Sequence, residues 1–202
     1  MQKMLLPLAV SLLFFYCSCN QKNNTNTVQL QKDTTEQQTF FPVTQYLLGQ
    51  LKEIDSLPVT PLKITSIDGK IDSAWMKKED IRPFAQPFLH PEIDSANFKN
   101  LFTSKSFLDQ TINSFTFSYD PIDKLPDSLQ LRRWDVYIDP QKNTITRIYI
   151  VKETNVNGAL QTTQLTWKSN QWCKIVTITE QPGKQPTTKE ETMKWDFSDT
   201  SS

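Results

Sequence analysis

Three of the four arginines in the chain, Arg132, Arg133 and Arg147, lie in two segments that are rich in strand-forming residues. A guanidinium group presents N–H donors that match the geometry of a carboxylate or a phosphate. If the two segments form facing strands, Arg133 and Arg147 come close enough to clamp an anion between them. We therefore single out these two residues as a candidate anion clamp. The simpler alternative is a sheet surface on which the arginines form ordinary salt bridges.

Acidic residues form a second candidate group. Asp120, Asp123 and Asp127 lie within one short segment that also contains two prolines. Two carboxylates at a suitable separation can act as acid and base, as they do in glycosidases. This leaves a hydrolase that uses an acidic loop as one alternative function. The simpler interpretation is turn chemistry, because Asp-Pro sequences are common in turns.

Metal and cofactor chemistry has little support in the residue types. His90 is the only histidine, with Glu92 and Asp94 close behind it. Zinc sites usually take three or four ligands, mostly histidine and cysteine, and this chain has few of either. Four glycines in 202 residues also argue against Gly-rich phosphate or cofactor loops. We expect no catalytic residue, no metal site and no cofactor, and therefore a protein that is not an enzyme.

The charge of the chain is balanced. It contains 22 basic and 22 acidic residues, which gives a formal net charge of +0 at pH 7. There is no basic excess to neutralise a phosphate backbone, so nucleic acid is not an expected partner.

The clearest pattern lies in the first nineteen residues. Lys3 is followed by an apolar run of about 13 residues, Met4 to Tyr16, and then by Cys17-Ser18-Cys19. A basic start, a short apolar run and a small residue before a cysteine are typical of a secretory signal. The run is shorter than the roughly 20 residues that a membrane-spanning helix needs. The segment resembles the signal peptide and lipobox of bacterial lipoproteins.

The resemblance implies that Cys19 is the lipidation site, because the small Ser18 precedes it whereas Tyr16 precedes Cys17. It also implies that Cys19 is acylated, becomes the first residue of the mature protein and anchors the chain in the membrane. Asn20 after the cysteine would not act as an inner-membrane retention signal, which favours the outer membrane, on its periplasmic side. Secretion without lipid and a retained signal anchor are the alternatives.

The rest of the chain divides into three parts. Residues 20–39 are rich in Asn, Gln and Thr and nearly free of large apolar groups, so we expect a disordered tether. A single domain is expected over residues 40–197, followed by a disordered tail over residues 198–202. Once Cys17 is removed and Cys19 acylated, Cys173 is the one remaining thiol, so no disulfide framework is expected.

Periodicity predicts the elements of the domain. Apolar residues at helical spacing predict helices over 40–57 and 78–89 and a short helix over 95–102. Asp68-Gly69 predicts a hairpin turn between two strands within 62–75. From Phe115 onward the period becomes two, with short turns between strands, and the alternation slips by one residue at Arg132-Arg133, as in a β-bulge. Short loops between strands require antiparallel neighbours.

Together these patterns predict an α+β fold, in which N-terminal helices pack on a twisted antiparallel meander sheet of about five to seven strands. The outline is similar to the half-barrels of lipoprotein-carrier proteins, in which a curved sheet closes on a helix around an acyl chain. The leading functional hypothesis is a lipid-anchored, non-enzymatic periplasmic lipoprotein that binds an envelope protein or assists envelope assembly. A carrier of an apolar ligand in the concave face of the sheet is the alternative.

Overall fold

Apolar residues at helical spacing form the first element of the domain. In the computed structural model, which describes residues 40–126 and 128–198, helix α1 spans Val43–Ser56. Its buried apolar residues recur every three or four positions and therefore form a single stripe along the helix. They are Val43, Leu47, Leu51 and Ile54.

The described residues all belong to one compact unit, Glu36–Ser202. The expected signal peptide with Cys19, the expected tether, Asp127 and residues 199–202 of the expected tail lie outside the described residues.

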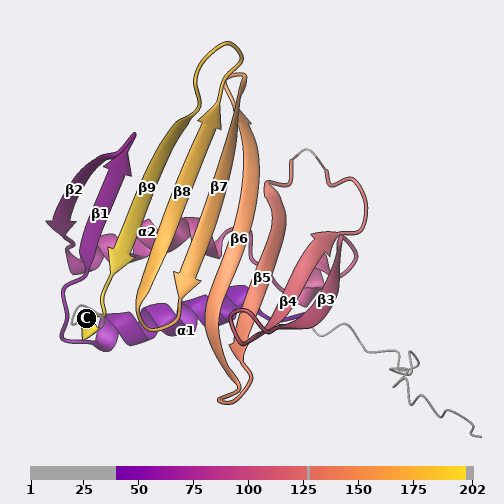
Figure 1. Cartoon of the computed structure of the whole chain (residues 1–202), viewed down its shortest axis with the longest axis horizontal. Coiled ribbons are helices and arrows are strands. Elements are labelled where there is room, and N and C mark those ends of the chain that lie inside the picture. Colours follow the sequence, from indigo (N-terminus) through magenta and orange to yellow (C-terminus); the bar gives the residue numbers. More distant parts are fainter. Residues whose placement is uncertain (1–39, 127, 199–202) are drawn as a thin grey trace, which may run out of the picture. The chain divides into compact units, whose positions relative to one another are not determined.

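Two further helices and nine strands follow α1 in the described part of the chain (Figure 1). Helix α2 spans Lys78–Leu89 and helix α3 spans Ser95–Phe98. The strands are β1 (Leu62–Ile67), β2 (Lys70–Trp75), β3 (Phe102–Asp109), β4 (Ser114–Pro121), β5 (Leu131–Asp139), β6 (Thr144–Val156), β7 (Ala159–Lys168), β8 (Trp172–Glu180) and β9 (Thr187–Lys194).

All nine strands form one antiparallel sheet in the order β2-β1-β9-β8-β7-β6-β5-β4-β3. Strands β3 to β9 are a meander, and the hairpin β1–β2 joins the sheet beside β9. The hairpin turn has Asp68 and Gly69 at φ values of 47° and 84°, both in the left-handed region. A two-residue turn with two positive φ angles matches the right-handed twist of the flanking strands, and Asp-Gly adopts it readily.

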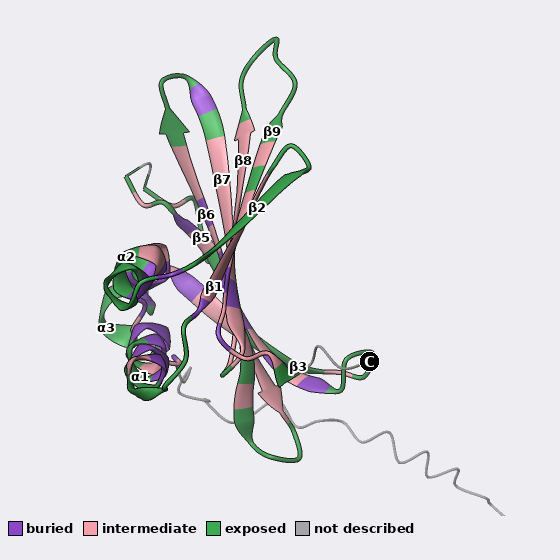
Figure 2. Ribbon diagram, turned by 90° about the vertical axis from the view of Figure 1, so that its left-hand side faces the viewer, coloured by how far each residue is buried: buried purple, intermediate pink, exposed green. Residues whose placement is uncertain are grey.

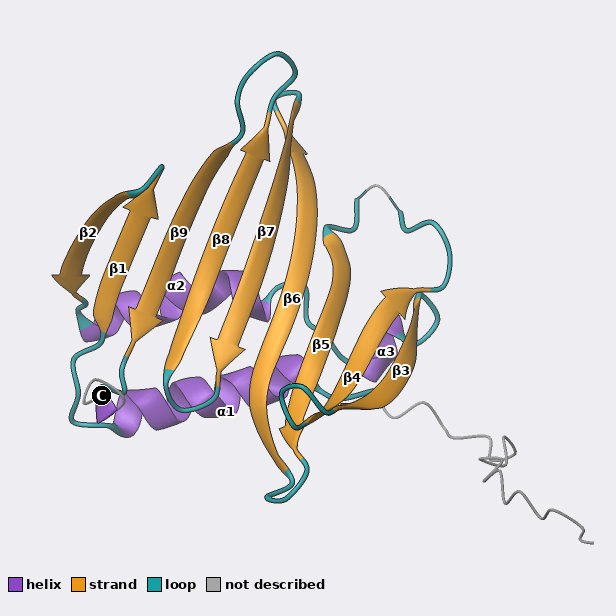
Figure 3. Cartoon of the chain, viewed as in Figure 1, coloured by secondary structure: helices purple, strands orange, loops and turns teal. Residues whose placement is uncertain are grey.

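The three helices lie on the same face of the sheet, which we call the covered face (Figures 2 and 3). An aromatic cluster fills the space between helices and sheet. Trp134 of β5 is fully buried at its centre, stacked on Tyr119 with ring centroids 4.6 Å apart. The ring centroid of Phe102 lies 4.7 Å from that of the same indole. Farther along the sheet, Phe88 of α2 packs edge-on against Trp167, with ring centroids 5.3 Å apart. The opposite face of the sheet, which carries no helix, is called the open face.

The expected α+β class with an antiparallel meander is confirmed, but two finer predictions are wrong. The sheet has nine strands rather than five to seven. The helices also do not form an N-terminal block, because β1 and β2 lie between α1 and α2. Both errors concern the edges of the sheet: the hairpin β1–β2 forms one edge, and β3 forms the other.

Strand β3 was not predicted because its pattern is weak. Only Phe102 in it is buried, and the residues Lys105 to Leu108 are exposed. An edge strand with so little buried surface has no clear alternation of apolar and polar residues. The predicted helix over 95–102 is accordingly shorter and ends at Phe98.

Trp134 tests the aromatic cluster. Trp134→Ala removes a fully buried indole and its ring contacts, so we expect the free energy of unfolding to fall by about 3–5 kcal/mol. The matched control is Trp75→Ala on β2, where the side chain is 65 % exposed and we expect a loss below about 1 kcal/mol. Chemical denaturation of both variants measures the difference. Equal losses would contradict the assignment of Trp134 to the centre of the core.

Candidate functional site

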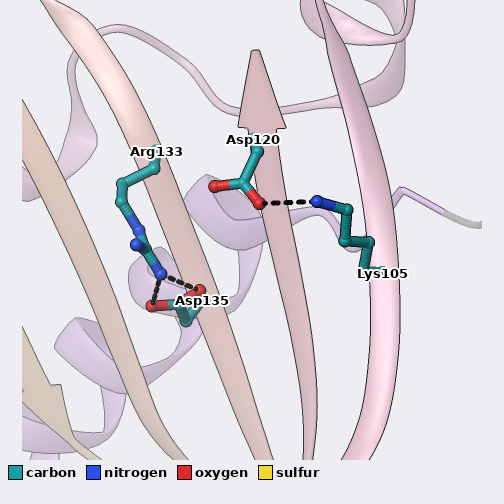
Figure 4. A network of polar contacts seen from close by, with 4 residues as sticks. All are labelled: Lys105, Asp120, Arg133 and Asp135. Carbon is teal, nitrogen blue, oxygen red and sulfur yellow. Dashed lines mark hydrogen bonds and ion pairs between the residues drawn. The ribbon is translucent and has the colours of Figure 1, made fainter. Parts of the chain in front are cut away.

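The open face carries a network of charged side chains across its β3–β5 end (Figure 4). Lys105 of β3 lies 3.6 Å from a carboxylate oxygen of Asp120 of β4. On β5, the guanidinium of Arg133 donates to both carboxylate oxygens of Asp135, at 3.0 and 3.1 Å. Asp135 is only 3 % exposed although it lies on the open face. Its burial makes Arg133 necessary, because a buried carboxylate without a partner is strongly destabilising.

The two arginines of the candidate clamp are on the same face but are not opposite one another. Arg133 pairs in register with Val151, and Arg147 pairs with Tyr137. Arg147 stacks on the ring of Tyr137, with its guanidinium carbon 4.0 Å from the ring centroid. Arg133 is engaged by Asp135, as described above. A clamp that uses these two arginines together stays a prediction.

Arg147 has a different cationic neighbour, which the sequence analysis did not single out. Consecutive register pairs place Tyr137, Arg147, Lys168 and Trp172 side by side across strands β5 to β8, and Lys194 of β9 is opposite Trp172. We call these five residues the cationic row. The signal that could have located Lys168 is the two-residue turn Asn157-Gly158 between β6 and β7, because this turn fixes the register that places Lys168 opposite Arg147.

A pocket of about 280 Å³ lies on this row. Tyr137, Arg147, Lys168 and Trp172 line it, together with Ile112, Ser114 and Thr146. The pocket therefore combines two cations with two aromatic rings. Burial raises the pKa of the Tyr137 hydroxyl, and Asp135 raises it further while Arg147 opposes the shift. The phenol accordingly stays neutral at physiological pH.

A buried lysine lies on the covered face. Lys152 of β6 is 8 % exposed, and its ammonium donates to the backbone carbonyls of Pro87 and His90 at the C-terminal end of α2. Carbonyls in the last turn of a helix have no intrahelical donor, so the lysine satisfies them. Burial lowers the pKa of Lys152 to about 8. The alternation Ile148, Ile150, Lys152 places all three residues on the same face and could have revealed the burial.

The surroundings of Lys152 contain further polar groups. A pocket of about 500 Å³ is lined by Lys152 together with His90, Gln130, Thr163 and Glu191. An amine with a lowered pKa can act as a base or a nucleophile. The Lys152 ammonium, however, donates to two carbonyls at the end of α2. This contact gives it a structural role as a helix-capping group.

The remaining candidate residues are dispersed. Asp120 is paired with Lys105, Asp123 is exposed and Asp127 lies outside the described residues. Cys173 is fully buried in β8, and burial raises the pKa of its thiol well above the usual range, so the thiol is unreactive. Within residues 40–126 and 128–198, no three His, Cys, Asp or Glu side chains come together as a metal site.

Strand β2 is an exposed edge. All six of its residues are exposed, and two of them are large apolar side chains, Ile71 at 75 % and Trp75 at 65 %. The β1–β2 register pairs Ile67 with Lys70 next to the two-residue turn. Because bonded and non-bonded pairs alternate in an antiparallel ladder, the backbone groups of Ile71, Ser73 and Trp75 point away from β1. The N–H of Ser73 is consistent with this direction, since it donates to the Asp72 carboxylate at 2.9 Å.

No family model, no curated protein and no solved structure matches this chain. Among the helices of the described residues, none has the length and apolar character to cross a bilayer.

The titration of Lys152 gives a testable dependence of stability on pH. Its pKa is about 8 in the folded chain against a usual value of 10.5, so the unfolded chain binds more protons between these two values. Lys152 therefore makes the free energy of unfolding rise as the pH increases from about 8 to about 10.5. In Lys152→Met this contribution to the pH dependence of the free energy of unfolding is absent.

Urea denaturation of both proteins at several pH values across this window measures the difference between their slopes. Lys174→Met on the open face is the control for the removal of a lysine side chain. Parallel curves for the wild type and Lys152→Met would show that the folded and unfolded chains bind the same number of protons at this residue.

Proposed function

We propose that this chain is a lipid-anchored, non-enzymatic lipoprotein of the cell envelope, held at the periplasmic side of the outer membrane and acting as a protein-binding module. The segment Lys3 to Cys19 supports the anchor, through its signal-like pattern and the small residue before Cys19. The observation that carries the binding role is the exposed edge strand β2.

Strand β2 has the properties of a strand-addition site. An unpaired edge offers backbone N–H and C=O groups to an extended segment of another protein, while side-chain contacts supply specificity. The outward backbone groups of Ile71, Ser73 and Trp75 alternate with positions bonded to β1. Ile71 and Trp75 are large, apolar and exposed on the same face, which suits a partner strand with apolar side chains. The proposed partner is an extended segment of an envelope protein.

The interior of the domain favours a binder over a carrier of an apolar ligand. A carrier needs an apolar cavity of several hundred cubic ångströms between sheet and helix. In this domain, aromatic rings fill the middle of the covered face, among them those of Trp134, Phe102 and Trp167. The two larger pockets at its margins, of about 500 and 520 Å³, have several polar and charged residues in their lining. The acidic segment also gives little support to a hydrolase, because Asp120 is engaged by Lys105.

The anchor is tested at Cys19. We expect the mature chain to begin at Cys19 and to carry the mass of fatty acyl groups, because Ser18 provides the small residue before the cysteine. Cys19→Ala should leave the signal uncleaved and the chain unacylated, whereas the matched control Cys17→Ala should be processed normally. Mass spectrometry of the purified N-terminus measures both. A trimmed wild-type chain without acyl mass would rule out the anchor.

The binding role is tested on β2 in the full chain. A photo-reactive amino acid at Ile71 is expected to cross-link to an envelope protein in intact cells. The same amino acid at Phe107 is the matched control, because Phe107 is also exposed on the open face of an edge strand, β3.

A second substitution distinguishes strand addition from side-chain contact. Ser73→Pro removes an N–H that points away from β1, so the hairpin should persist. The edge then loses a donor that a partner strand would take over from the exposed Asp72 carboxylate. We expect Ser73→Pro to reduce the Ile71 adduct at least about fivefold, roughly 1 kcal/mol of binding for one lost hydrogen bond. An undiminished adduct, or an equal adduct from Phe107, would contradict the proposal.

A further inference from the structure

The cations of the open face fall into two groups that differ in their partners. The members of the first group each lie within 3.6 Å of a carboxylate oxygen: Lys105, Arg133 and Lys174. The second group consists of the three cations of the cationic row, Arg147, Lys168 and Lys194. Within residues 40–126 and 128–198, none of these three forms an ion pair with a carboxylate. The row is thus the part of the open face where the cations lie outside ion-pair distance of a carboxylate.

Two cations of the row are direct neighbours. Arg147 and Lys168 are register partners on adjacent strands. Like charges directly opposite one another on neighbouring strands are destabilising. The carboxylates of Asp139 and Asp196, which terminate β5 and follow β9, are occupied by hydrogen bonds within their own turns. An anion from outside the domain would remove the repulsion between Arg147 and Lys168.

The local backbone shapes this neighbourhood into a pocket. The register between β5 and β6 shifts after Tyr137, so Thr146 is an extra residue on β6, and its hydroxyl donates to the Tyr137 carbonyl at 3.2 Å. Such bulges bend a strand and re-aim side chains, often beside functional sites. Stacking on Tyr137 holds the Arg147 guanidinium in place. The resulting pocket of about 280 Å³ lies near the lower limit for small-ligand sites, about 300 Å³.

We propose that this pocket binds a phosphate monoester. Its oxygens would accept hydrogen bonds from the Arg147 guanidinium and the Lys168 ammonium, and its organic part would pack against Trp172. A phosphate monoester carries close to two negative charges at neutral pH, which matches two adjacent cations better than a carboxylate does. Arg147 covers one face of the Tyr137 ring, and Trp172 is the other aromatic residue in the lining of the pocket.

Two sources offer this chemistry: a soluble phosphorylated metabolite and a lipid whose headgroup is a phosphate monoester. The inference goes beyond the proposed protein-binding role and is independent of it, because it uses no residue of β2 and no lipid anchor. Ser73→Pro should therefore leave phosphate binding unchanged.

Isothermal titration of the purified full chain tests the site at constant ionic strength. The probes are inorganic phosphate, phenyl phosphate and a soluble short-chain phosphatidic acid. We expect all three to bind. Tighter binding of phenyl phosphate would indicate a soluble metabolite as the source, and tighter binding of phosphatidic acid would indicate a lipid. Arg147→Gln and Lys168→Gln should each weaken binding about tenfold or more, the usual effect of losing one charge-assisted hydrogen bond. Trp172→Ala should weaken phenyl phosphate more than inorganic phosphate.

The matched control is Lys174→Gln, which removes the same charge from the same face at a lysine paired with Glu190. It should change the affinity less than about twofold, since an exposed paired charge contributes little. Thermal melting reports on folding: Lys168→Gln should not lower the melting temperature, because it removes a like-charge contact. Absence of binding by all three probes, or equal losses in Lys174→Gln and Lys168→Gln, would overturn the proposal.

Discussion

The burial of only one sheet face is the constraint on which the rest of the structure depends. Trp134 and Val136 are fully buried on the covered face of β5. Successive side chains of a strand point to opposite faces, so Arg133, Asp135 and Tyr137 must lie on the open face. A slip of one residue would place a guanidinium and a carboxylate among the aromatic rings. The aromatic core therefore fixes the register of β5, and through it the positions of the open-face charges.

The irregularities of the sheet lie at both ends of the charged segment of β5. One register shift separates Leu131 from Arg133, and a second follows Tyr137. Between them the pairing with β6 is regular and holds Asp135 opposite Tyr149. The first shift begins the segment that carries the Arg133–Asp135 pair, and the second positions Thr146 beside Arg147. The Arg133–Asp135 pair and the Tyr137–Arg147 stack both lie in the regular segment between these two shifts.

Local sequence patterns predicted the elements that have a strong local cause. Asp68-Gly69 specifies its turn through backbone conformation alone, and the slip in alternation at Arg132-Arg133 coincides with an observed bulge. Strand β3 has no comparable signal, because its single buried residue, Phe102, gives no periodicity. The edge position of the hairpin β1–β2 could not be predicted, since it depends on pairing with β9, more than 100 residues away in the chain.

The candidate sites were harder to predict for the same reason. Residue type and strand character were enough to identify Arg133 and Arg147 as candidates, and both lie on the open face. Which cations are neighbours, however, is decided by register: Arg147 is opposite Lys168, whereas Arg133 is paired within its own strand. Lys152 was missed because a lysine in a strand is normally exposed. Its burial depends on carbonyl groups of α2, a partner about 60 residues away.

The balanced charge of the whole chain gives no indication that some cations of the open face are in ion pairs and others are not. A formal net charge of +0 means that acidic and basic residues are equal in number over the whole chain. The net charge does not determine the charge of any one region, because each ion pair balances one cation with one nearby carboxylate. On the open face, Asp120, Asp135 and Glu190 are each engaged by a neighbouring cation. Among the described residues, Arg147 and Lys168 have no ion-pair partner, so a domain with balanced charge still places two cations side by side.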